Sequence, residues 1–251
     1  MHSISLSNPE KAGIVANDII GDLLISRICP QGGVFFDIGA QYGAVFSSAW
    51  RHDPTLKVYA FEADTTKAST LKKVHPRLTV FDLAVGDAEG VASFYLDAKA
   101  SGYNSLVPGR SGTRKVSVRV SSIDALLPNQ PVDVMKVDVE GAELGVFKGA
   151  EQTIMRYFPL LMFECVLKEE NTLGYSAGAI WKWLNDRDYL IFSPNRMAHN
   201  SPAYSKQAFV EAQNYPFQSH NWFAIHASRR EEFRDAARSI LKISKNFSAS
   251  S

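Results

Sequence analysis

An acidic residue and two glycines follow the first strongly apolar run of the chain. The run leads into Asp37, and Gly39 and Gly43 stand in the turn that comes next. Glycines let the backbone approach a ligand closely, and the N-terminus of the following helix would lie nearby. In an open parallel sheet, ligands bind where the carboxyl ends of the strands meet. This turn is therefore the first candidate for a binding site, although a glycine-tightened turn without a ligand would have the same pattern.

The residue types in this turn favour one class of ligand. A dinucleotide-binding turn has the pattern G-x-G-x-x-G, whereas here Asp37 stands at the first glycine position and Tyr42 at the last. A carboxylate would repel a pyrophosphate but attract the ammonium and sulfonium groups of S-adenosylmethionine. We therefore expect a site for S-adenosylmethionine rather than for NAD. The residues expected to form its first part are Asp37, Gly39, Ala40 and Gly43.

Two further acidic residues end the next two apolar runs. Glu62 comes about 20 positions after the glycine turn, where an acidic residue normally binds the ribose hydroxyls of a nucleotide. A carboxylate that accepts two hydroxyl groups suits a ribose without a 2′-phosphate. We expect Asp82, at the end of the third run, to contact the adenine amino group. A solvated aspartate at the start of a loop is an equally good interpretation of Asp82.

A third group of charges lies in MKVDVEG (135–141). In a strand, Lys136, Asp138 and Glu140 would share one face, because side chains at alternate positions point the same way. Charges on a buried strand are costly unless they are paired or engaged with a ligand. Asp138 is thus the first candidate for the group that orients or deprotonates a methyl acceptor, with Lys136 beside it and Glu164 as a second candidate. A purely structural Lys136–Asp138 pair is the alternative.

The same carboxylates raise the question of a metal ion. Asp138, Glu140 and Glu164 could bind a divalent cation through their oxygen atoms. The chain has no clear metal-ligand spacing motif, so no metal is assigned.

The apolar pattern indicates which elements position these residues. Between residues 33 and 86, buried apolar runs alternate with helical segments, which is typical of a parallel sheet with right-handed crossovers. One of these helices has Asp64 as its expected N-cap. An earlier helix, within residues 1–30, is expected to cover a sheet edge. Further strands are expected at 132–141, 160–166, 189–195 and 221–227, and helices at 142–158, 176–188 and 229–245.

Two long segments, 98–114 and 194–220, interrupt this pattern. The first is rich in glycine, serine and basic residues, and it lies between two runs that alternate as half-exposed strands do. We expect it to form a lid over the methyl acceptor, although a solvated loop would look the same. The side chains expected to contact the acceptor there are Tyr103, Asn104 and Ser105. His220, at the end of the second segment, is a further candidate, but a lone loop histidine is more often solvated.

Taken together, the motifs resemble the FkbM family of methyltransferases. The matching segments are DIGAQYG (37–43), FE (61–62), AVGD (84–87), SID (122–124), MKVDVEGAELGVFKGA (135–150) and PLLMFE (159–164). Gln41, where such motifs usually carry Asn, and Ala63, where Pro is common, depart from the pattern. The resemblance implies a class I methyltransferase fold of the α/β class: a Rossmann-like, mostly parallel seven-stranded sheet with helices on both faces and an antiparallel last strand. It also implies methyl transfer to a hydroxyl oxygen on a sugar or another small metabolite.

Length and composition set the domain expectations. A chain of 251 residues, 45% of them hydrophobic and 21% charged, suits one α/β domain with elaborations. We expect a helical segment at 1–30, a Rossmann-like domain at 31–228 that carries the two long insertions, and a C-terminal helix and tail at 229–251. The net charge of +1 argues against a nucleic-acid partner, and no apolar run is long enough to span a membrane.

Cysteine usage and the N-terminal sequence set the expected compartment. Cys29 and Cys165 do not indicate a disulfide framework, and the first residues lack the pattern of a secretory signal. A cytoplasmic location is therefore the default expectation. Trp181 and Trp183 cannot both face the core from one helix, so one of them is expected at an interface, which a homodimer would supply.

Two other function classes stay open beside the methyltransferase. One is a different Rossmann enzyme, such as a NAD-dependent oxidoreductase, which Asp37 and the missing glycines disfavour. The other is a non-catalytic protein that binds S-adenosylmethionine, which the intact acidic strand ends disfavour. The partner expected for the methyltransferase is a small-molecule acceptor.

Overall fold

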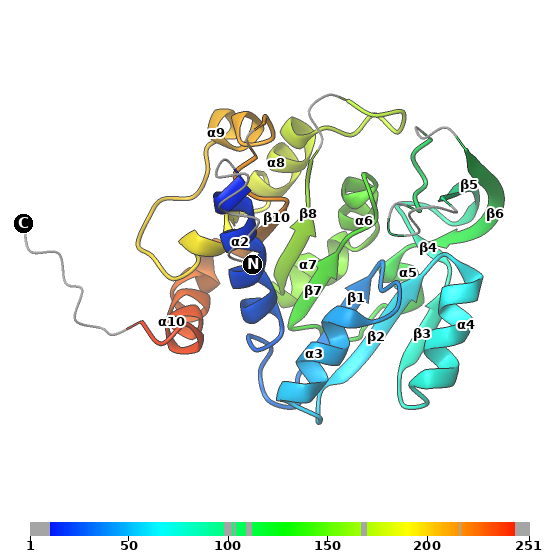
Figure 1. The fold of residues 1–251 in the computed structure, drawn as a ribbon, viewed down its shortest axis with the longest axis horizontal. Coiled ribbons are helices and arrows are strands. Elements are labelled where there is room, and N and C mark those ends of the chain that lie inside the picture. The colour runs from blue at the N-terminus through cyan, green and yellow to red at the C-terminus, as the bar shows by residue number, and fades with distance from the viewer. Residues whose placement is uncertain are drawn as a thin grey trace, which may run out of the picture.

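The computed structural model describes residues 11–97, 102, 104–108, 112–166, 170–215 and 217–243. Its main sheet has seven strands in the order β3-β2-β1-β7-β8-β10-β9 (Figure 1). They are β1 (Val34–Ile38), β2 (Lys57–Glu62), β3 (Thr79–Asp82), β7 (Val134–Val137), β8 (Leu160–Glu164), β9 (Tyr189–Phe192) and β10 (Asn221–His226). Strand β10 is antiparallel to both of its neighbours, and the other pairs are parallel. This is the expected class I methyltransferase sheet, and its order reverses between β1 and β7.

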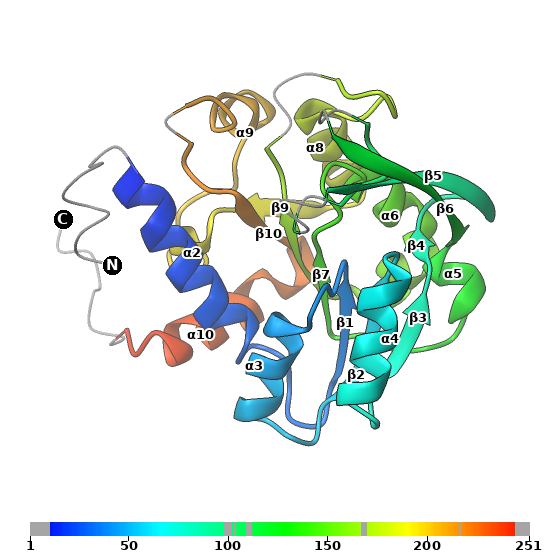
Figure 2. The ribbon, with the colours of Figure 1, turned by 45° about the vertical axis from the view of Figure 1, so that its right-hand side comes forward.

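Apolar residues on both sides of the strands explain the two helical layers (Figure 2). In β1, Phe35 and Phe36 are both fully buried, although they belong to different core clusters on opposite faces. One face is covered by α2 (Ala12–Ile25), α3 (Ala44–His52), α4 (Thr65–Val74) and α10 (Arg230–Ile240). The other is covered by α5 (Ile123–Leu126), α6 (Glu143–Gly149), α7 (Glu151–Tyr157), α8 (Ala177–Asn185) and α9 (Lys206–Glu211). None of the helices in these described ranges combines the length and apolarity that crossing a membrane requires.

The N-terminal helix lies on a face of the sheet, so its expected place at the edge was wrong. Leu24 and Ile25 of α2 belong to the same buried cluster as Phe35 of β1 and Phe223 of β10. The helix also contacts α3 and α10, and the three form one layer in Figure 2. The apolar side chains of this helix need a wide apolar surface, and the face of the sheet supplies one.

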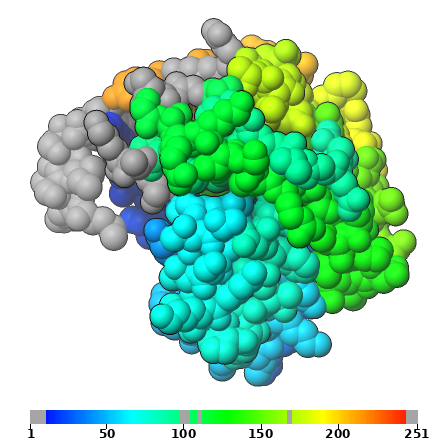
Figure 3. Space-filling view, turned by 90° about the vertical axis from the view of Figure 1, so that its right-hand side faces the viewer, coloured from blue at the N-terminus to red at the C-terminus, as the bar shows by residue number. Residues whose placement is uncertain are grey.

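The third apolar run contributes to two sheets. After β3 and Leu83, the chain forms β4 (Ala84–Val85), which pairs in parallel with β6 (Thr113–Ser121). Strand β6 pairs antiparallel with β5 (Gly90–Asp97), which completes a three-stranded sheet β4-β6-β5. In Figure 3 this small sheet is the green layer above the cyan atoms of α4 and β3. The alternating runs predicted both long strands but not their common sheet.

The helical segments after β7 and β9 also differ from expectation. The helix expected at 142–158 is two helices, α6 and α7, which meet at Ala150 because its backbone is not helical. The segment 194–220 holds a 3-10 turn, η3 (Pro194–Arg196), and α9; a second turn, η4 (Ala227–Arg229), precedes α10. Trp183 stacks on Phe147 in the core, whereas Trp181 donates its indole N–H to the carbonyl of Tyr204 at 2.9 Å.

Candidate active site

The turn after β1 lies directly against the turn after β7. Gly39 has a φ of +78°, and a Cβ at this position would lie 1.8 Å from the carbonyl oxygen of Asp138. The backbone N–H groups of Gly39 and Ala40 both donate to the carbonyl oxygen of Phe61, at 2.9 and 3.1 Å. The turn is thus held to β7 on one side and to β2 on the other. Only glycine allows the close approach to Asp138.

Gly43 has a local structural role at the start of α3. Its φ is +79°, and a Cβ there would lie 2.2 Å from the ring of Phe46. The glycine therefore lets the ring fold back under the turn. Neither Gly43 nor Ala40 lines the pocket that adjoins this turn.

Asp37 and Lys136 form a buried ion pair across β1 and β7. They are partners in the strand register, and the Lys136 Nζ lies 3.5 Å from Asp37 Oδ1. The same ammonium lies 3.2 Å from Asp138 Oδ2 and donates to the Gly39 carbonyl at 3.1 Å. Burial acts to lower the pKa of Lys136, but the two carboxylates raise it above its usual value and prevail. Lys136 thus stays charged and joins the two turns.

Asp37 is positioned behind the site rather than in it. Its side chain is 1% exposed and does not line the adjoining pocket. Burial raises the pKa of Asp37, and the Lys136 ammonium opposes that rise. Asp37 therefore lies behind the pocket lining, where its ion pair with Lys136 joins it to the neighbouring strand.

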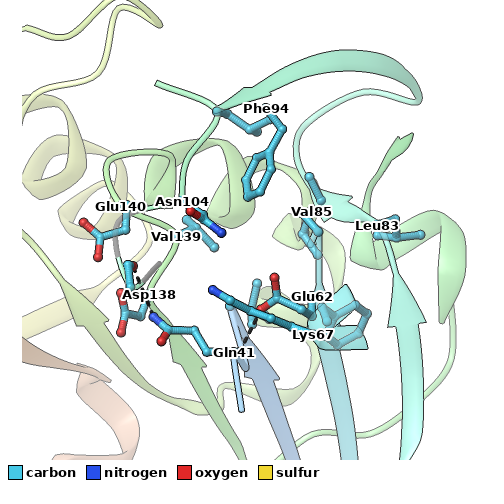
Figure 4. A pocket seen from close by; sticks show the side chains of 17 residues that line it. Gln41, Glu62, Lys67, Leu83, Val85, Phe94, Asn104, Asp138, Val139 and Glu140 are labelled. Atoms are coloured by element: carbon cyan, nitrogen blue, oxygen red, sulfur yellow. Dashed lines mark hydrogen bonds between the residues drawn. The ribbon is translucent and has the colours of Figure 1, made fainter. Parts of the chain in front are cut away.

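A pocket of about 490 Å³ opens beside these turns (Figure 4). Its polar lining comes from Gln41, Glu62, Lys67, Asn104, Asp138 and Glu140, and its apolar lining includes Phe61, Leu83, Val85, Phe94 and Leu106. These apolar residues come from the ends of β2 and β3, from the small sheet and, for Leu106, from the loop between β5 and β6. A pocket with one polar and one apolar side suits a ligand that joins a sugar to a flat base.

Glu62 is fixed by the backbone of two turns. Its carboxylate accepts the N–H of Gln41 at 2.7 Å and that of Asp64 at 2.8 Å, and the residue is 4% exposed. Burial raises the pKa of Glu62, while these hydrogen bonds and the nearby Lys67 oppose the rise. Each carboxylate oxygen can accept one further hydrogen bond. Figure 4 shows the carboxylate directed into the pocket, as expected for a group that binds a diol.

Lys67 also lines this pocket, although sequence analysis did not identify it. It lies in the first turn of α4, is 2% exposed, and has its Nζ 5.6 Å from the ring centroid of Tyr42. The expected N-cap is confirmed, because Asp64 accepts the backbone N–H groups of Thr66 and Lys67. This N-cap was the sequence signal that could have identified Lys67, because the start of the helix fixes which of its lysines lies beside Glu62.

Two predicted acceptor residues attach the first long loop to the pocket rim. Asn104 donates from Nδ2 to Asp64 Oδ2 at 3.1 Å and lines the pocket. Ser105 donates to the carbonyl oxygen of Glu140 at 2.7 Å and is not part of the lining. Tyr103, the third, lies outside the described residues. The described part of this loop therefore borders the pocket of Glu62, and its place over the acceptor stays a prediction.

Carboxylates gather beyond the pocket, where β7 and β8 end. One oxygen from each of Asp138, Glu140 and Glu164 lies within 4.8 Å of the others. Strand β7 ends at Val137 and Glu140 has a φ of +57°, so the expected common strand face was wrong. A tight turn, not strand alternation, brings Asp138 and Glu140 to the same place.

Burial changes the acidity of Glu164 and of the neighbouring Glu143. The pKa of Glu164 rises to about 9, first through burial and then through repulsion by Asp138 and its neighbours. Glu143, which is 1% exposed, accepts two backbone N–H groups of the turn at 3.1 and 3.2 Å, yet burial raises its pKa to about 7. Sequence analysis did not select Glu143, because an acidic residue in the first turn of a helix ordinarily needs no other explanation.

A second cavity, of about 330 Å³, adjoins this group. It is lined by Glu140, Gly141, Glu143, Glu164 and Val166. Glu140 lines both the pocket and this cavity, so the two spaces meet at this residue. The carboxylates therefore stand between two places in which ligands can bind.

Two predicted site residues lie away from both spaces. Asp82 ends β3 as the register partner of Glu62, but the following Leu83 lines the pocket in its place. His220 accepts the backbone N–H of Cys165 with its carbonyl oxygen at 2.9 Å, and its ring lies 5.4 Å from that of Phe217. Neither residue lines the pocket or the cavity.

Comparisons with solved structures give matches at low identity. Methyltransferase FkbM from Methylobacillus flagellatus is 16% identical, with a TM-score of 0.47 over 77% of this chain and 43% of that one. A TehB-like SAM-dependent methyltransferase from Corynebacterium glutamicum is 10% identical, with a TM-score of 0.42 over 82% of this chain and 85% of that one. A SAM-dependent O-methyltransferase from Thermotoga maritima is 11% identical, with a TM-score of 0.40 over 70% and 52% of the two chains. The chain thus spans less than half of the M. flagellatus protein.

Comparison with sequences gives the family. No curated protein sequence matches this chain significantly. Residues 37–191 match the Methyltransferase FkbM domain. The match begins at Asp37 in β1 and ends in β9, so it includes the glycine turn, Glu62 and all the carboxylates described above. Because it covers more than half of the sequence, this protein belongs to the FkbM family of methyltransferases.

Proposed function

We propose that this protein transfers a methyl group from S-adenosylmethionine to a hydroxyl oxygen of a sugar or another small metabolite. The observation that carries the proposal is the meeting of two spaces at Glu140, one bordered by Glu62 and the other by Glu164. The first has the polar and apolar sides that a nucleoside needs. The second offers carboxylates to an acceptor hydroxyl. Membership of a methyltransferase family supports this division between donor and acceptor.

The residues of the pocket fit the methyl donor. Glu62 would accept the two ribose hydroxyls, because each of its oxygens keeps acceptor capacity on the pocket side. Leu83, Val85 and Phe94 would enclose the adenine between apolar surfaces. Asp138 would attract the positive amino-acid end of the donor. S-adenosylmethionine, when bound, supplies a methyl group that its sulfonium sulfur has already activated.

The chain itself must align the acceptor and take its proton. Alignment alone can supply a large part of the rate, because methyl transfer needs the acceptor oxygen in line with the methyl group. In our proposal Asp138 accepts the hydroxyl proton while Lys136, 3.2 Å away, holds its carboxylate in place. Glu164, with a pKa of about 9, keeps its own proton near neutral pH and shares it with Asp138.

Titration calorimetry on the full chain tests the donor. S-adenosylhomocysteine should bind with a stoichiometry of one and more tightly than NAD. Tighter binding of NAD would contradict the donor assignment and favour the oxidoreductase alternative.

A turnover assay with matched acceptors tests the reaction. Pairs of small metabolites that differ only by an alcohol or an amine at one position would be incubated with S-adenosylmethionine. We expect S-adenosylhomocysteine release and a mass gain of one CH₂ with the alcohols. Methylation of the amines alone would contradict O-methylation. Donor binding without turnover on any acceptor would favour the non-catalytic alternative.

A further inference from the structure

We propose that Asp138, Glu140 and Glu164 bind a hard divalent cation, with Mg²⁺ as the physiological candidate. One carboxylate oxygen from each residue lies within 4.8 Å of the other two. Oxygens bound to one cation at the usual 2.0–2.6 Å lie no more than about 5 Å apart, so this arrangement needs little change to close around an ion. A site with only carboxylate oxygens favours Mg²⁺, Mn²⁺ or Ca²⁺ over softer metals.

The contact between Asp138 and Glu164 points to a missing positive charge. Their carboxyl groups are within hydrogen-bonding distance of each other. Asp138 Oδ1 is nevertheless buried, and no donor in the described parts of the chain reaches it. Two carboxylates can face each other in this way only when a proton or a cation lies between them. The geometry therefore requires either a proton or a cation between Asp138 and Glu164.

Glu143 gives a second, independent indication. The residue is 1% exposed, and its Oε1 is fixed by two backbone N–H groups at 3.1 and 3.2 Å. Its other oxygen, Oε2, is buried and has no hydrogen-bond partner among the described residues. Glu143 lines the same cavity as Glu140 and Glu164. An oriented carboxylate of this kind suits a water molecule bound to the cation, which would satisfy Oε2.

The ammonium group beside Asp138 is shared with a second carboxylate. Within 4 Å, Lys136 Nζ contacts Asp138, but it also pairs with Asp37 at 3.5 Å. One ammonium is thus divided between Asp37 and Asp138, while Glu164 faces Asp138 from the other side. Like charges in contact are costly, and a divalent cation between Asp138 and Glu164 would offset this cost.

The position of the site suggests what the cation would do. Glu140 lines both the donor pocket and the neighbouring cavity, so an ion at its carboxylate would stand between donor and acceptor. A cation there would bind the acceptor oxygen and lower the pKa of its hydroxyl group. It would favour acceptors that carry a second oxygen next to the methylated one, because both oxygens can bind the ion. This role rests on the proposed function, whereas the binding of the cation does not.

Binding of Mn²⁺, followed by electron paramagnetic resonance on the full chain without donor, tests the site. We expect one site with a Kd in the range of about 10⁻⁵–10⁻³ M, and competition by Mg²⁺. Glu164→Gln and Glu140→Gln keep the side-chain shape but remove a charged ligand, so each should weaken binding at least tenfold. Glu231→Gln makes the same change on an exposed part of α10 and should leave binding unchanged.

Folding and donor binding are measured on the same samples. Gln at position 164 keeps a hydrogen-bond donor for Asp138 without needing a bound proton, so the Tm of Glu164→Gln should equal or exceed that of the wild type. Wild-type protein without a Mn²⁺ site overturns the proposal and means that Asp138 and Glu164 share a proton. Unchanged Mn²⁺ binding in both Gln variants overturns it as well. A protein that binds S-adenosylhomocysteine but not Mn²⁺ would count against the cation site alone. A protein that binds Mn²⁺ but not S-adenosylhomocysteine would count against the proposed donor.

Discussion

The Glu62 carboxylate accepts the backbone N–H groups of Gln41 and Asp64, so the hydrogen bonds that hold it come from the backbone. We predict that Glu62→Ala weakens donor affinity by about 1–3 kcal/mol through loss of the ribose hydrogen bonds. Glu62→Gln keeps one carbonyl acceptor and should lose less. Calorimetric titration with S-adenosylhomocysteine measures both. Unchanged affinity in a folded Glu62→Ala protein would mean that the ribose binds elsewhere.

The contacts of Lys136 make it possible to separate the effect of an Asp138 substitution on turnover from its effect on stability. Lys136 keeps Asp37 at 3.5 Å and the Gly39 carbonyl at 3.1 Å when Asp138 loses its charge. We therefore predict that Asp138→Asn lowers turnover by ~10²–10⁴ while the melting temperature changes little. Turnover and thermal melting are measured on one preparation. Near-normal turnover would transfer the role of proton acceptor to Glu164.

The raised pKa of Glu164 predicts how stability depends on pH. Its pKa is ordinarily 4.5 and rises to about 9 in the folded protein, so the folded state binds the proton more tightly. The resulting stability is fully present below pH 4.5 and is lost as the pH rises toward about 9. The Tm of metal-free protein should therefore fall across this window, and Glu164→Gln should flatten the fall. Equal slopes in thermal melts of the two proteins would contradict the assignment.

The sequence identified candidate site residues where a charged residue follows or ends a run of apolar residues. Glu62, Asp138 and Glu164 follow buried strands in this way, and all three line the pocket or the adjoining cavity. Lys67 and Glu143 follow helix starts instead, and charged residues are ordinary there. Their burial depends on what packs over them, which no local pattern encodes.

At the scale of elements, Asn104 attaches the described part of the loop after β5 to the pocket that Glu62 lines. Its side chain joins the loop to Asp64 at the start of α4 and accepts the N–H of Asp97 at 2.8 Å. We predict that Asn104→Ala releases this attachment and weakens donor affinity by about 1 kcal/mol. Asn214→Ala, at an exposed position, is the matched control. Equal donor affinity of the two variants in calorimetry would show that the loop does not contribute to donor binding.

The main sheet could be predicted because each of its strands is an apolar run long enough to recognise. The small sheet could not, since β4 consists of Ala84 and Val85 alone. Its partner in β6 is Val120 with Ser121, far along the chain. Pairing at that separation is decided by the packing of β4 against the rest of the fold, and two residues carry no periodicity.

At the scale of the whole molecule, the contact between Gly39 and Asp138 joins the two halves of the sheet. A Cβ at Gly39 would lie 1.8 Å from the Asp138 carbonyl, and the φ of +78° is itself unfavourable for alanine. We predict that Gly39→Ala lowers the free energy of unfolding by several kcal/mol, since strain of this kind costs about 1–3 kcal/mol before any clash is counted. Donor affinity and turnover should fall together.

Gly13 supplies the control for that substitution. It lies in α2 with nothing within 4 Å of a built Cβ, so Gly13→Ala should be neutral or stabilise by about 0.5–1 kcal/mol. Chemical denaturation of both variants makes the comparison. Similar stability of the two would mean that the turns can separate without cost.

The small sheet has a further consequence for how the protein could be altered. The chain enters β5 at Gly90 and leaves β6 at Ser121, beside β4, so the whole excursion begins and ends at one place. Its described links to the rest of the pocket include the side chains of Asn104 and Ser105. We expect that residues 90–121 can be exchanged as a unit in a chimera that keeps these two side chains and the pairing of β6 with β4. Such a transplant would change the roof of the pocket while leaving Glu62 and the carboxylates of β7 and β8 as they are.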